Sequence, residues 1–271
     1  MDDLGTKTEK KLTDRDLQHY GIALFDVLGF SELHKKLGTE KLYLVYEQLI
    51  DKAIIEKTKE GVKFLGATRE GLFVVGNLEV RFVYFSDTIL LWTPFNEVFF
   101  PFFVTICSEF MIDAIDIGLP LRGALTVGDA IMDRTKGIFL GEPIIEAARL
   151  EKAQNWIGVT FGTSFNSIGL HEAMINFTDI QLNYTSQMKV GYEELNSRVV
   201  LDWARKMREL NKTELIKTKL TTAMNLTDKK SYYENTFAFF DYSDKNQNWV
   251  EDMKNQAKER HKQSRPDNEA R

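Results

Sequence analysis

The sequence predicts an α+β fold in which helices pack on one principal sheet. Along residues 20–162, short apolar runs of strand length alternate with longer stretches whose apolar residues recur at helical spacing. Glycine and proline separate many of these runs, as they do at the ends of helices and strands. The chain has 271 residues, of which 43% are hydrophobic, so it can bury one sizeable core.

The first half begins with a strand and two helices. Residues 20–27 form a short apolar run that ends near an aspartate, which is typical of a buried strand. Gly29 permits a tight turn after it, and Ser31 is placed to cap a short helix that extends to about Leu37. Residues 39–59 carry apolar side chains near one helical face. Further strands are expected at residues 71–76, 79–86 and 88–93.

The second half continues the alternation. Residues 97–117 predict a second long helix, which Gly118 ends and Pro120 follows. A third helix is expected over residues 143–154, with Pro143 in the first turn, where proline is tolerated. The strands expected around these helices cover residues 121–127, 130–133 and 157–161.

This order of elements predicts an α/β sandwich of the ferredoxin-like kind, followed by a C-terminal extension of strand and helix. We divide the chain into a polar N-terminal segment (1–19), a main domain (20–203) and a helical, charged extension (204–271). Strand-like pieces are expected late in the main domain, at residues 185–190 and 199–203. The polar residues 254–271 are expected to be disordered.

The composition argues against several classes of protein. A net charge of −5 and a pI near 5.6 leave no basic face for general nucleic-acid binding. Residues 1–18 are polar and unlike a secretory signal, and the single cysteine, Cys107, forms no internal disulfide, so we expect a cytoplasmic protein. The most apolar stretch, 98–115, contains Pro101 and two acidic residues, and it predicts a buried or subunit-interface helix rather than a membrane span.

Two aspartates stand inside apolar strand regions. Asp26 lies near the end of the first strand, and Asp87 lies between the strands 79–86 and 88–93. Burying a carboxylate is costly unless something pairs with it. Two carboxylates on neighbouring strands can share a divalent cation, because hard cations such as Mg²⁺ prefer oxygen ligands. The alternative is an ordinary turn or capping aspartate at each position. The four histidines are scattered without ligand spacing, which argues against zinc.

Four segments, in this order, resemble the catalytic domain of class III nucleotide cyclases, and the resemblance covers residues 20–162. Residues 25–31 (FDVLGFS) resemble the first metal motif, and residues 85–88 (FSDT) resemble the second, with serine where the family usually has glycine. Residues 121–128 (LRGALTVG) resemble the strand that carries a phosphate-binding arginine. Residues 141–151 (GEPIIEAARLE) resemble the helix that carries the transition-state arginine.

The resemblance implies a role for each motif residue. Asp26 and Asp87 would hold two Mg²⁺ or Mn²⁺ ions, with the carbonyl of Val27 as a further ligand. Arg122 would bind phosphate, and Arg149 would stabilise charge on the α-phosphoryl group or the leaving pyrophosphate. Backbone N–H groups at a helix N-terminus would bind the β- and γ-phosphates; these groups belong to Leu28, Gly29, Phe30 and Ser31.

In this family the metal-binding face and the arginine-bearing face come from different subunits. The resemblance therefore implies a homodimer with two composite active sites, whose catalytic domain covers residues 20–203. We expect the aromatic helix at 98–115 to help hold the two subunits together.

Three positions depart from the family's purine-reading pattern. Ile145 replaces an asparagine, and the purine-binding lysine and aspartate would fall near Val83 and Ile138. Polar groups left unpaired in a closed pocket are penalised, so the usual adenine readout cannot operate. The chain thus resembles the bacterial anti-phage subset that makes cyclic pyrimidine nucleotides. We expect it to convert UTP to 3′,5′-cyclic UMP and pyrophosphate, for a separate cyclic-nucleotide-sensing effector.

Other interpretations stay open at this point. Within the same resemblance, the alternatives to a uridylate cyclase are, in order, a cytidylate cyclase that uses CTP, an adenylate cyclase with altered base contacts, and a catalytically dead homologue that binds a nucleotide. Locally, Arg122 could face solvent, and Arg149 could form a surface pair with Glu146. Lys189 could reach the pocket, although a solvated lysine is the ordinary case.

Overall fold

The structure is a computed structural model, and it describes residues 13, 15–55, 63–67, 73–168, 179–249, 251–252 and 255. Most of the predicted N-terminal segment, 1–19, lies outside the described residues. The prediction that residues 254–271 are disordered also lies outside them, apart from residue 255.

The chain forms an α+β fold, as predicted, with helices on a mixed sheet. The N-terminal half contains β1 (Gln18–Val27), α1 (Phe30–Leu37), α2 (Thr39–Ile50), the π-helical turn η1 (Asp51–Ile55), β2 (Lys63–Ala67), β3 (Phe73–Asn77), β4 (Arg81–Phe85), β5 (Thr88–Pro94) and α4 (Phe100–Asp116). The C-terminal half contains β6 (Leu121–Asp133), β7 (Ile138–Leu140), α5 (Glu142–Ala153), β8 (Val159–Phe161), η2 (Thr163–Ile168), β9 (Ile180–Leu182), η4 (Glu193–Leu195), β10 (Val199–Leu201), α7 (Trp203–Glu209), α8 (Thr213–Asn225) and α9 (Lys230–Lys245).

Some predicted elements differ from the observed ones. The strands expected at 121–127 and 130–133 are one continuous strand, β6, because β1 pairs with it through Gly128 and Ala130 and keeps the backbone extended. Residues 185–190 do not form the predicted strand, and only Met188 makes an isolated bridge there, to Gln154. The strands β2, β7 and β9 were not among the predicted ranges.

The principal sheet has eight strands among the described residues, seven of them in the order β4-β5-β1-β6-β8-β10-β9, with β7 paired to β6. The central strand β1 is antiparallel to both of its neighbours, β5 and β6. The pairing of β6 with β8 is parallel, so the sheet is mixed. Strands β2 and β3 form a separate two-stranded sheet.

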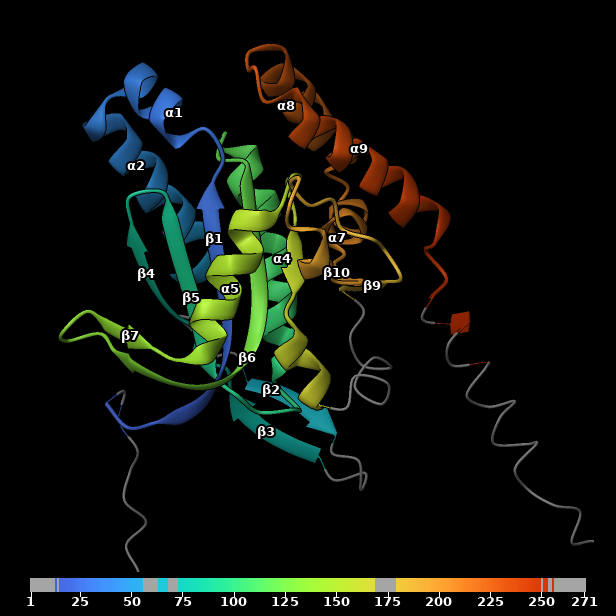
Figure 1. Cartoon of the computed structure of the whole chain (residues 1–271). Coiled ribbons are helices and arrows are strands. Elements are labelled where there is room, and N and C mark those ends of the chain that lie inside the picture. The colour runs from blue at the N-terminus through green and yellow to red at the C-terminus, as the bar shows by residue number, and fades with distance from the viewer. Residues whose placement is uncertain are drawn as a thin grey trace, which may run out of the picture.

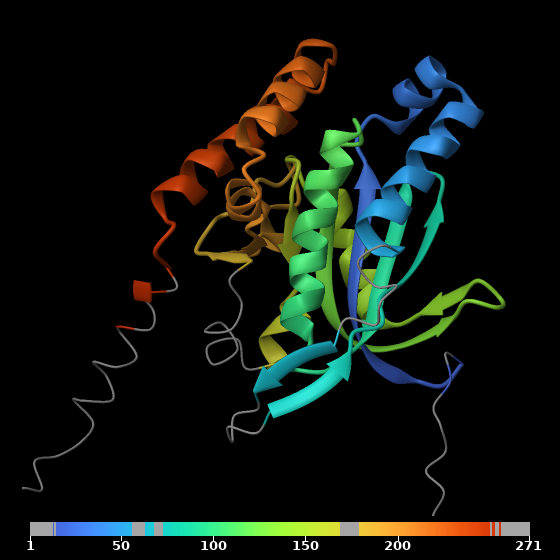
Figure 2. The ribbon, with the colours of Figure 1, turned by 180° about the vertical axis from the view of Figure 1, so that it is seen from behind.

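Helices cover both faces of the sheet. Helix α5 crosses one face in Figure 1, and α4 crosses the opposite face, which is turned to the viewer in Figure 2. Side chains along β1 alternate accordingly, since successive residues of a strand point to opposite faces. Ile22 and Leu24 belong to the apolar cluster beneath α5, whereas Ala23 and Phe25 belong to the larger cluster around α4. By this alternation Asp26 lies on the α5 face.

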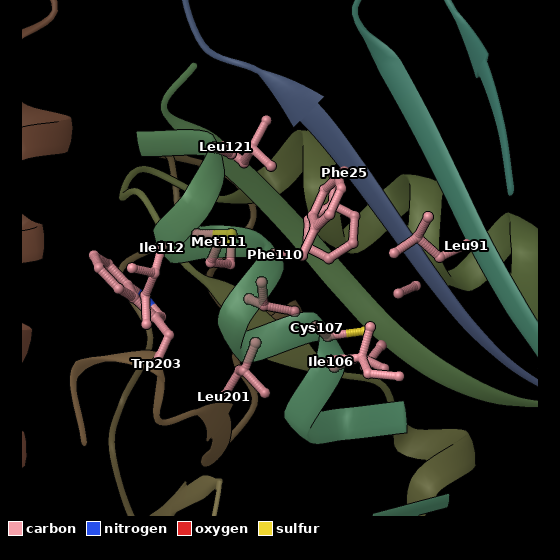
Figure 3. Packing of buried hydrophobic residues seen from close by; sticks show 14 of the residues in the cluster. Phe25, Leu91, Ile106, Cys107, Phe110, Met111, Ile112, Leu121, Leu201 and Trp203 are labelled. Atoms are coloured by element: carbon pink, nitrogen blue, oxygen red, sulfur yellow. The ribbon is translucent and has the colours of Figure 1, made fainter. Parts of the chain in front are cut away.

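Helix α4 is part of the core of this chain. Its aromatic residues Phe103 and Phe110 are fully buried, and the Phe110 ring lies 5.1 Å from that of Phe25, measured between centroids (Figure 3). Cys107 is also fully buried, and burial raises the pKa of its thiol. Most apolar side chains of α4 pack inside the core of this chain. The structure therefore gives no support to the expectation that α4 holds two subunits together.

The C-terminal extension shares this core. Trp203 of α7 and Phe239 of α9 are fully buried and belong to the same apolar cluster as Phe110. In both views, α1 and the α8–α9 pair rise at the end of the sheet where β1 finishes (Figures 1 and 2). No helix within the described part of the chain is both long and apolar enough to cross a membrane.

Candidate functional site

Asp26 and Asp87 meet where β1 ends. Asp26 is the second-last residue of β1, and Asp87 lies in the turn from β4 to β5. The backbone N–H of Val27 donates to the carbonyl oxygen of Asp87 at 2.9 Å, which joins the strand end to the turn. Ser86, beside Asp87, has a φ of 55°, so the turn contains a left-handed residue. The strand end that carries Asp26 and the turn that carries Asp87 therefore lie side by side.

Burial and charge both act on this pair. Burial raises the pKa of Asp26 above its ordinary value, the guanidinium of Arg122 opposes that rise, and the negative charge of Asp87 adds to it. Tyr46 of α2 borders the pair, and its hydroxyl donates to the carbonyl of Ser86 at 3.1 Å. Burial, followed by the charges of Asp87 and Asp26, raises the pKa of Tyr46. Two carboxylates that raise pKa values around them are suited to binding a cation.

The loop after β1 fits the predicted phosphate cradle only in part. Gly29 has a φ of 77°, a left-handed conformation that favours glycine, and it precedes the first residue of α1, Phe30. The N–H of Leu28 already donates to the carbonyl of Pro120 at 2.9 Å, so Leu28 does not serve as a free phosphate donor. Ser31 lies inside α1 and makes no capping hydrogen bond, so its predicted capping role is wrong.

The N–H groups of Gly29, Phe30 and Ser31 remain candidates for binding phosphate, because they lie at the N-terminus of α1. The first turn of a helix has no intrahelical acceptors for its N–H groups and carries a partial positive charge. The phosphate prediction is thus narrowed from four donors to three.

Arg122 lies on β6 directly opposite Asp26 in the strand register. Its Nη2 and Nε atoms lie 3.0 Å and 3.1 Å from Oδ2 of Asp26, and its Nε lies 2.7 Å from Oε1 of Glu151 on α5. Only 13% of its side chain is exposed, so the alternative of a solvent-facing arginine is wrong. Arg122 instead joins the first metal-ligand candidate to a second carboxylate.

Glu151 is a member of this cluster to which the sequence analysis gave no role. Burial raises the pKa of Glu151 to about 7, and Asp26 adds to the rise, although Arg122 lowers it. The Oε1 atom of Glu151 is buried and lies 2.7 Å from Nε of Arg122, and it accepts no aligned hydrogen bond from the described residues. A signal was available, because Glu151 follows the buried Ala147 by four residues and so lies on the buried face of α5.

Lys189 lies near the same cluster, and the sequence left open whether it reaches the site or is solvated. Its Nζ donates to the carbonyl of Lys152 at 2.5 Å, and its backbone N–H donates to the carbonyl of Ala153 at 2.7 Å. Burial lowers the pKa of Lys189, and the charge of Arg122 lowers it further, while Glu151 and Asp26 act in the opposite direction. Lys189 is therefore partly buried and held by two carbonyl groups beside the cluster, and its pKa responds to the charges of Arg122, Glu151 and Asp26.

Arg149 lies apart from this cluster. It lines a cavity of about 600 Å³ between α5, residues 161–165 and the segment 194–199. Asp26, Asp87 and Arg122 do not line that cavity. The structure thus brings three of the predicted side chains together and places the fourth in a different hollow of the same chain.

The surface pair between Arg149 and Glu146 is absent from the described contacts. Glu146 Oε1 instead accepts from the backbone N–H and the hydroxyl of Thr163, at 2.6 Å and 2.7 Å. Gly162 permits this approach, because a Cβ there would lie 2.6 Å from the Glu146 carboxyl carbon. Arg149 is exposed and makes no ion pair with another described residue, and Arg198 lines the same cavity.

The three positions that depart from the purine-reading pattern lie in apolar surroundings or at the surface. Val83 packs against the apolar cluster beneath α5. Ile138 and Ile145 are 42% and 54% exposed. None of the three side chains can donate or accept a hydrogen bond.

The donor set restricts how a metal ion could bind. Within the described residues, no three His, Cys, Asp or Glu side chains are grouped closely enough to hold a metal ion. A hard cation at Asp26 and Asp87 would therefore complete its coordination with the Val27 carbonyl, water or phosphate oxygens, as Mg²⁺ commonly does. No protein-family model matches the chain, and no curated protein matches it.

Proposed function

We propose that the chain is a nucleotide cyclase of the class III type, which converts UTP to 3′,5′-cyclic UMP and pyrophosphate. The observation that carries the proposal is the meeting of Asp26 and Asp87 at the end of the central strand, with Arg122 opposite Asp26. A pair of carboxylates beside a guanidinium and a helix N-terminus suits a metal-bound triphosphate.

The fold supports the proposal. Strands β1, β4, β5 and β6 occur in that order along the chain, with helices after β1 and after β5, and they lie in the sheet as β4-β5-β1-β6. This order of strands and helices supports a ferredoxin-like sandwich, the fold that the resemblance implies.

The residues at the end of β1, together with Arg122 and Lys189, have defined parts in the proposed reaction. Two Mg²⁺ or Mn²⁺ ions held by Asp26, Asp87 and the Val27 carbonyl would lower the pKa of the ribose 3′-hydroxyl and neutralise the triphosphate. The N–H groups of Gly29, Phe30 and Ser31 bind terminal phosphate oxygens. Arg122 and Lys189 add positive charge at the same end of the sheet.

The proposed chemistry is an in-line displacement. The ribose 3′-oxygen forms a bond to the α-phosphorus, and its proton passes to water. The bond from that phosphorus to the bridging oxygen breaks, and pyrophosphate leaves with the electron pair. Arg149 stabilises the negative charge that develops on the leaving group.

The position of Arg149 supports a composite site. In one chain, Arg149 opens into a cavity that Asp26 and Asp87 do not line. In a homodimer, Arg149 of the partner subunit completes the site at Asp26 and Asp87, and the twofold relation makes two such sites. Phe85 and Leu140 are 81% and 61% exposed, and they supply apolar surface for such contact.

The proposed preference for a pyrimidine base rests on the absence of polar side chains at the three positions that read a purine in the family. Val83, Ile138 and Ile145 offer no hydrogen bonds to a purine edge. A pyrimidine triphosphate is therefore the proposed substrate, with UTP first, CTP second and ATP third. In this proposal the chain acts in the cytoplasm in anti-phage defence, and its cyclic product acts on a separate effector.

One observation favours a second candidate, a catalytically inactive homologue that binds a nucleotide. Arg122 already contacts the carboxyl groups of Asp26 and Glu151, as expected of a residue that holds the fold together. A nucleotide-binding chain of this kind would need no turnover.

The deciding experiment incubates the purified chain separately with UTP, CTP, ATP and GTP in Mn²⁺ and identifies products by mass spectrometry. Cyclic UMP is expected from UTP. Asp87→Asn should abolish it, whereas Asp241→Asn, at an exposed position on α9, should not. Cyclic AMP as the main product would refute the pyrimidine assignment, and binding without any cyclic product would favour the inactive homologue.

A further inference from the structure

Arg122 is also contacted by a tyrosine from the C-terminal extension. Tyr232 lies in the first turn of α9, 110 residues away from Arg122 in the sequence. Arg122 Nη1 donates to the Tyr232 hydroxyl oxygen at 3.2 Å, and its guanidinium carbon lies 5.8 Å from the centre of the Tyr232 ring. That distance suits a cation–π contact. The cyclase resemblance ends at residue 162, so it assigns nothing to this tyrosine.

Helix α9 holds Tyr232 in a fixed place. Asn235 Nδ2 donates to the carbonyl of Asn155 at 2.7 Å, and the backbone N–H of Ile157 donates to Oγ1 of Thr236 at 2.8 Å. Thr236 is fully buried. These contacts join α9 to the segment between α5 and β8, next to the helix that carries Glu151. The position of Tyr232 is therefore fixed by the hydrogen bonds that join α9 to Asn155 and Ile157.

The nitrogen atoms of Arg122 divide between two sets of partners. Nη2 faces Asp26, and Nε faces Asp26 and Glu151. Nη1 instead donates to Tyr232 and, at 3.5 Å, to the carbonyl of Gln154. A cation on Asp26 would weaken the contact at Nη2 by competing for the same carboxylate. The same cation does not compete for the partners of Nη1, which are the Tyr232 hydroxyl and the Gln154 carbonyl.

We propose that Tyr232 is a positioning residue that holds Arg122 by Nη1, so that Nη2 can bind a phosphate oxygen of a nucleoside triphosphate when Asp26 binds metal. This inference rests on the proposed function. It makes the C-terminal extension a part of the substrate site, although the residue that touches the substrate is Arg122.

The test compares two tyrosines of the same helix. Tyr232→Phe removes the hydroxyl and keeps the ring, while Tyr242→Phe removes a hydroxyl that donates to the carbonyl of Asn183 at 3.1 Å. The KM for UTP in Mn²⁺ is expected to rise about fivefold in Tyr232→Phe with kcat changed less than about twofold, the size expected for one hydrogen bond to a charged group. Tyr242→Phe should keep both constants. Equal KM values in the two variants would overturn the inference.

A binding measurement separates positioning from general stability. Calorimetric titration with the α,β-methylene analogue of UTP and Mn²⁺ should show an about fivefold weaker Kd for Tyr232→Phe. In an Arg122→Lys background the same change should have no further effect, because lysine has no planar fork for Tyr232 to hold. An unchanged fivefold loss in that background would show that Tyr232 acts elsewhere.

The proposed function fails in a different way. A wild-type chain that binds the analogue but makes no cyclic product would refute the cyclase activity, and the Kd values would still decide the role of Tyr232. A wild-type chain that binds no triphosphate in Mn²⁺ would overturn both.

Discussion

The Asp26–Arg122 cluster and the Arg149 cavity lie on the same face of the sheet but differ in how their charges are balanced. In the cluster, Arg122 contacts two carboxylates and is 13% exposed. In the cavity, Arg149 is exposed and pairs with no other described residue, although three glutamates line the hollow. The comparison teaches that Arg122 takes part in the charge balance of the folded chain, whereas Arg149 is available to bind a ligand or a second subunit.

The largest expected effect separates these two arginines. Arg122→Ala leaves Asp26 and Glu151 without their shared cation, and we expect a loss of about 3 kcal/mol in the free energy of unfolding. Arg149→Ala should change that free energy by less than about 0.5 kcal/mol, since the side chain is exposed. Urea unfolding measures both, and cyclase activity should be lost in both. Equal stability of the two variants would contradict the contrast.

Mixing two inactive variants tests whether the cluster and the cavity complete one another across subunits. Asp87→Asn and Arg149→Ala should each be inactive alone. If they are mixed and allowed to exchange, half of the dimers are mixed and each contains one intact site, so about a quarter of wild-type activity should return. Activity assays over a range of mixing ratios measure this recovery. A mixture that stays inactive, although native mass spectrometry shows mixed dimers, would rule out a composite site.

The pH dependence of the free energy of unfolding tests the charge balance of the cluster. The folded pKa of Glu151 is raised to about 7 from an ordinary 4.5, so the folded chain keeps a proton that the unfolded chain has released. In metal-free protein the free energy of unfolding should therefore fall as pH rises from about 4.5 to about 7, by about 1–3 kcal/mol, and level off above. The raised pKa of Asp26 acts in the same direction.

Urea unfolding of wild type and Glu151→Gln at several pH values measures this slope. The variant should lose most of the decline, because its amide does not titrate. A wild-type stability that increases over the same interval would mean that the folded chain releases the Glu151 proton more readily than the unfolded chain does.

The smallest expected effect lies in the wall of the cavity. Glu146→Gln retains an oxygen that can accept from Thr163 but loses the negative charge, so stability should fall by about 0.5–1 kcal/mol. Thermal unfolding measures it, with Glu234→Gln, at an exposed position on α9, as the control. A loss as large as that of Arg122→Ala would show that the cavity wall is as tightly coupled to the fold as the cluster is.

Much of the cluster was predictable because its first members lie on neighbouring strands. The apolar run before Asp26 and the turn at Asp87 are local patterns, and both aspartates lie where those patterns place them. The ion pair of Asp26 with Arg122 was not predicted, because it depends on the register between β1 and β6. That register is set by pairing along the whole length of both strands.

Glu151, Lys189 and Tyr232 could not be foreseen as a group. Each reaches Arg122 or its carboxylates from an element far away in the sequence, and each is an ordinary charged or aromatic residue in its own segment. The Leu28 N–H was misassigned for a similar reason, since the carbonyl that occupies it belongs to Pro120.

The order of apolar and polar residues was sufficient to establish the alternation of strands and helices, the buried character of β1 and α4, and the position of Asp26 where a strand ends. These are local properties, because strand and helix periods repeat over a few residues. The partners of Arg122, the separation of Arg149 from the aspartates and the reach of Tyr232 were settled by packing between distant segments. Their energies depend on which charges are buried together, and burial is a property of the whole folded chain.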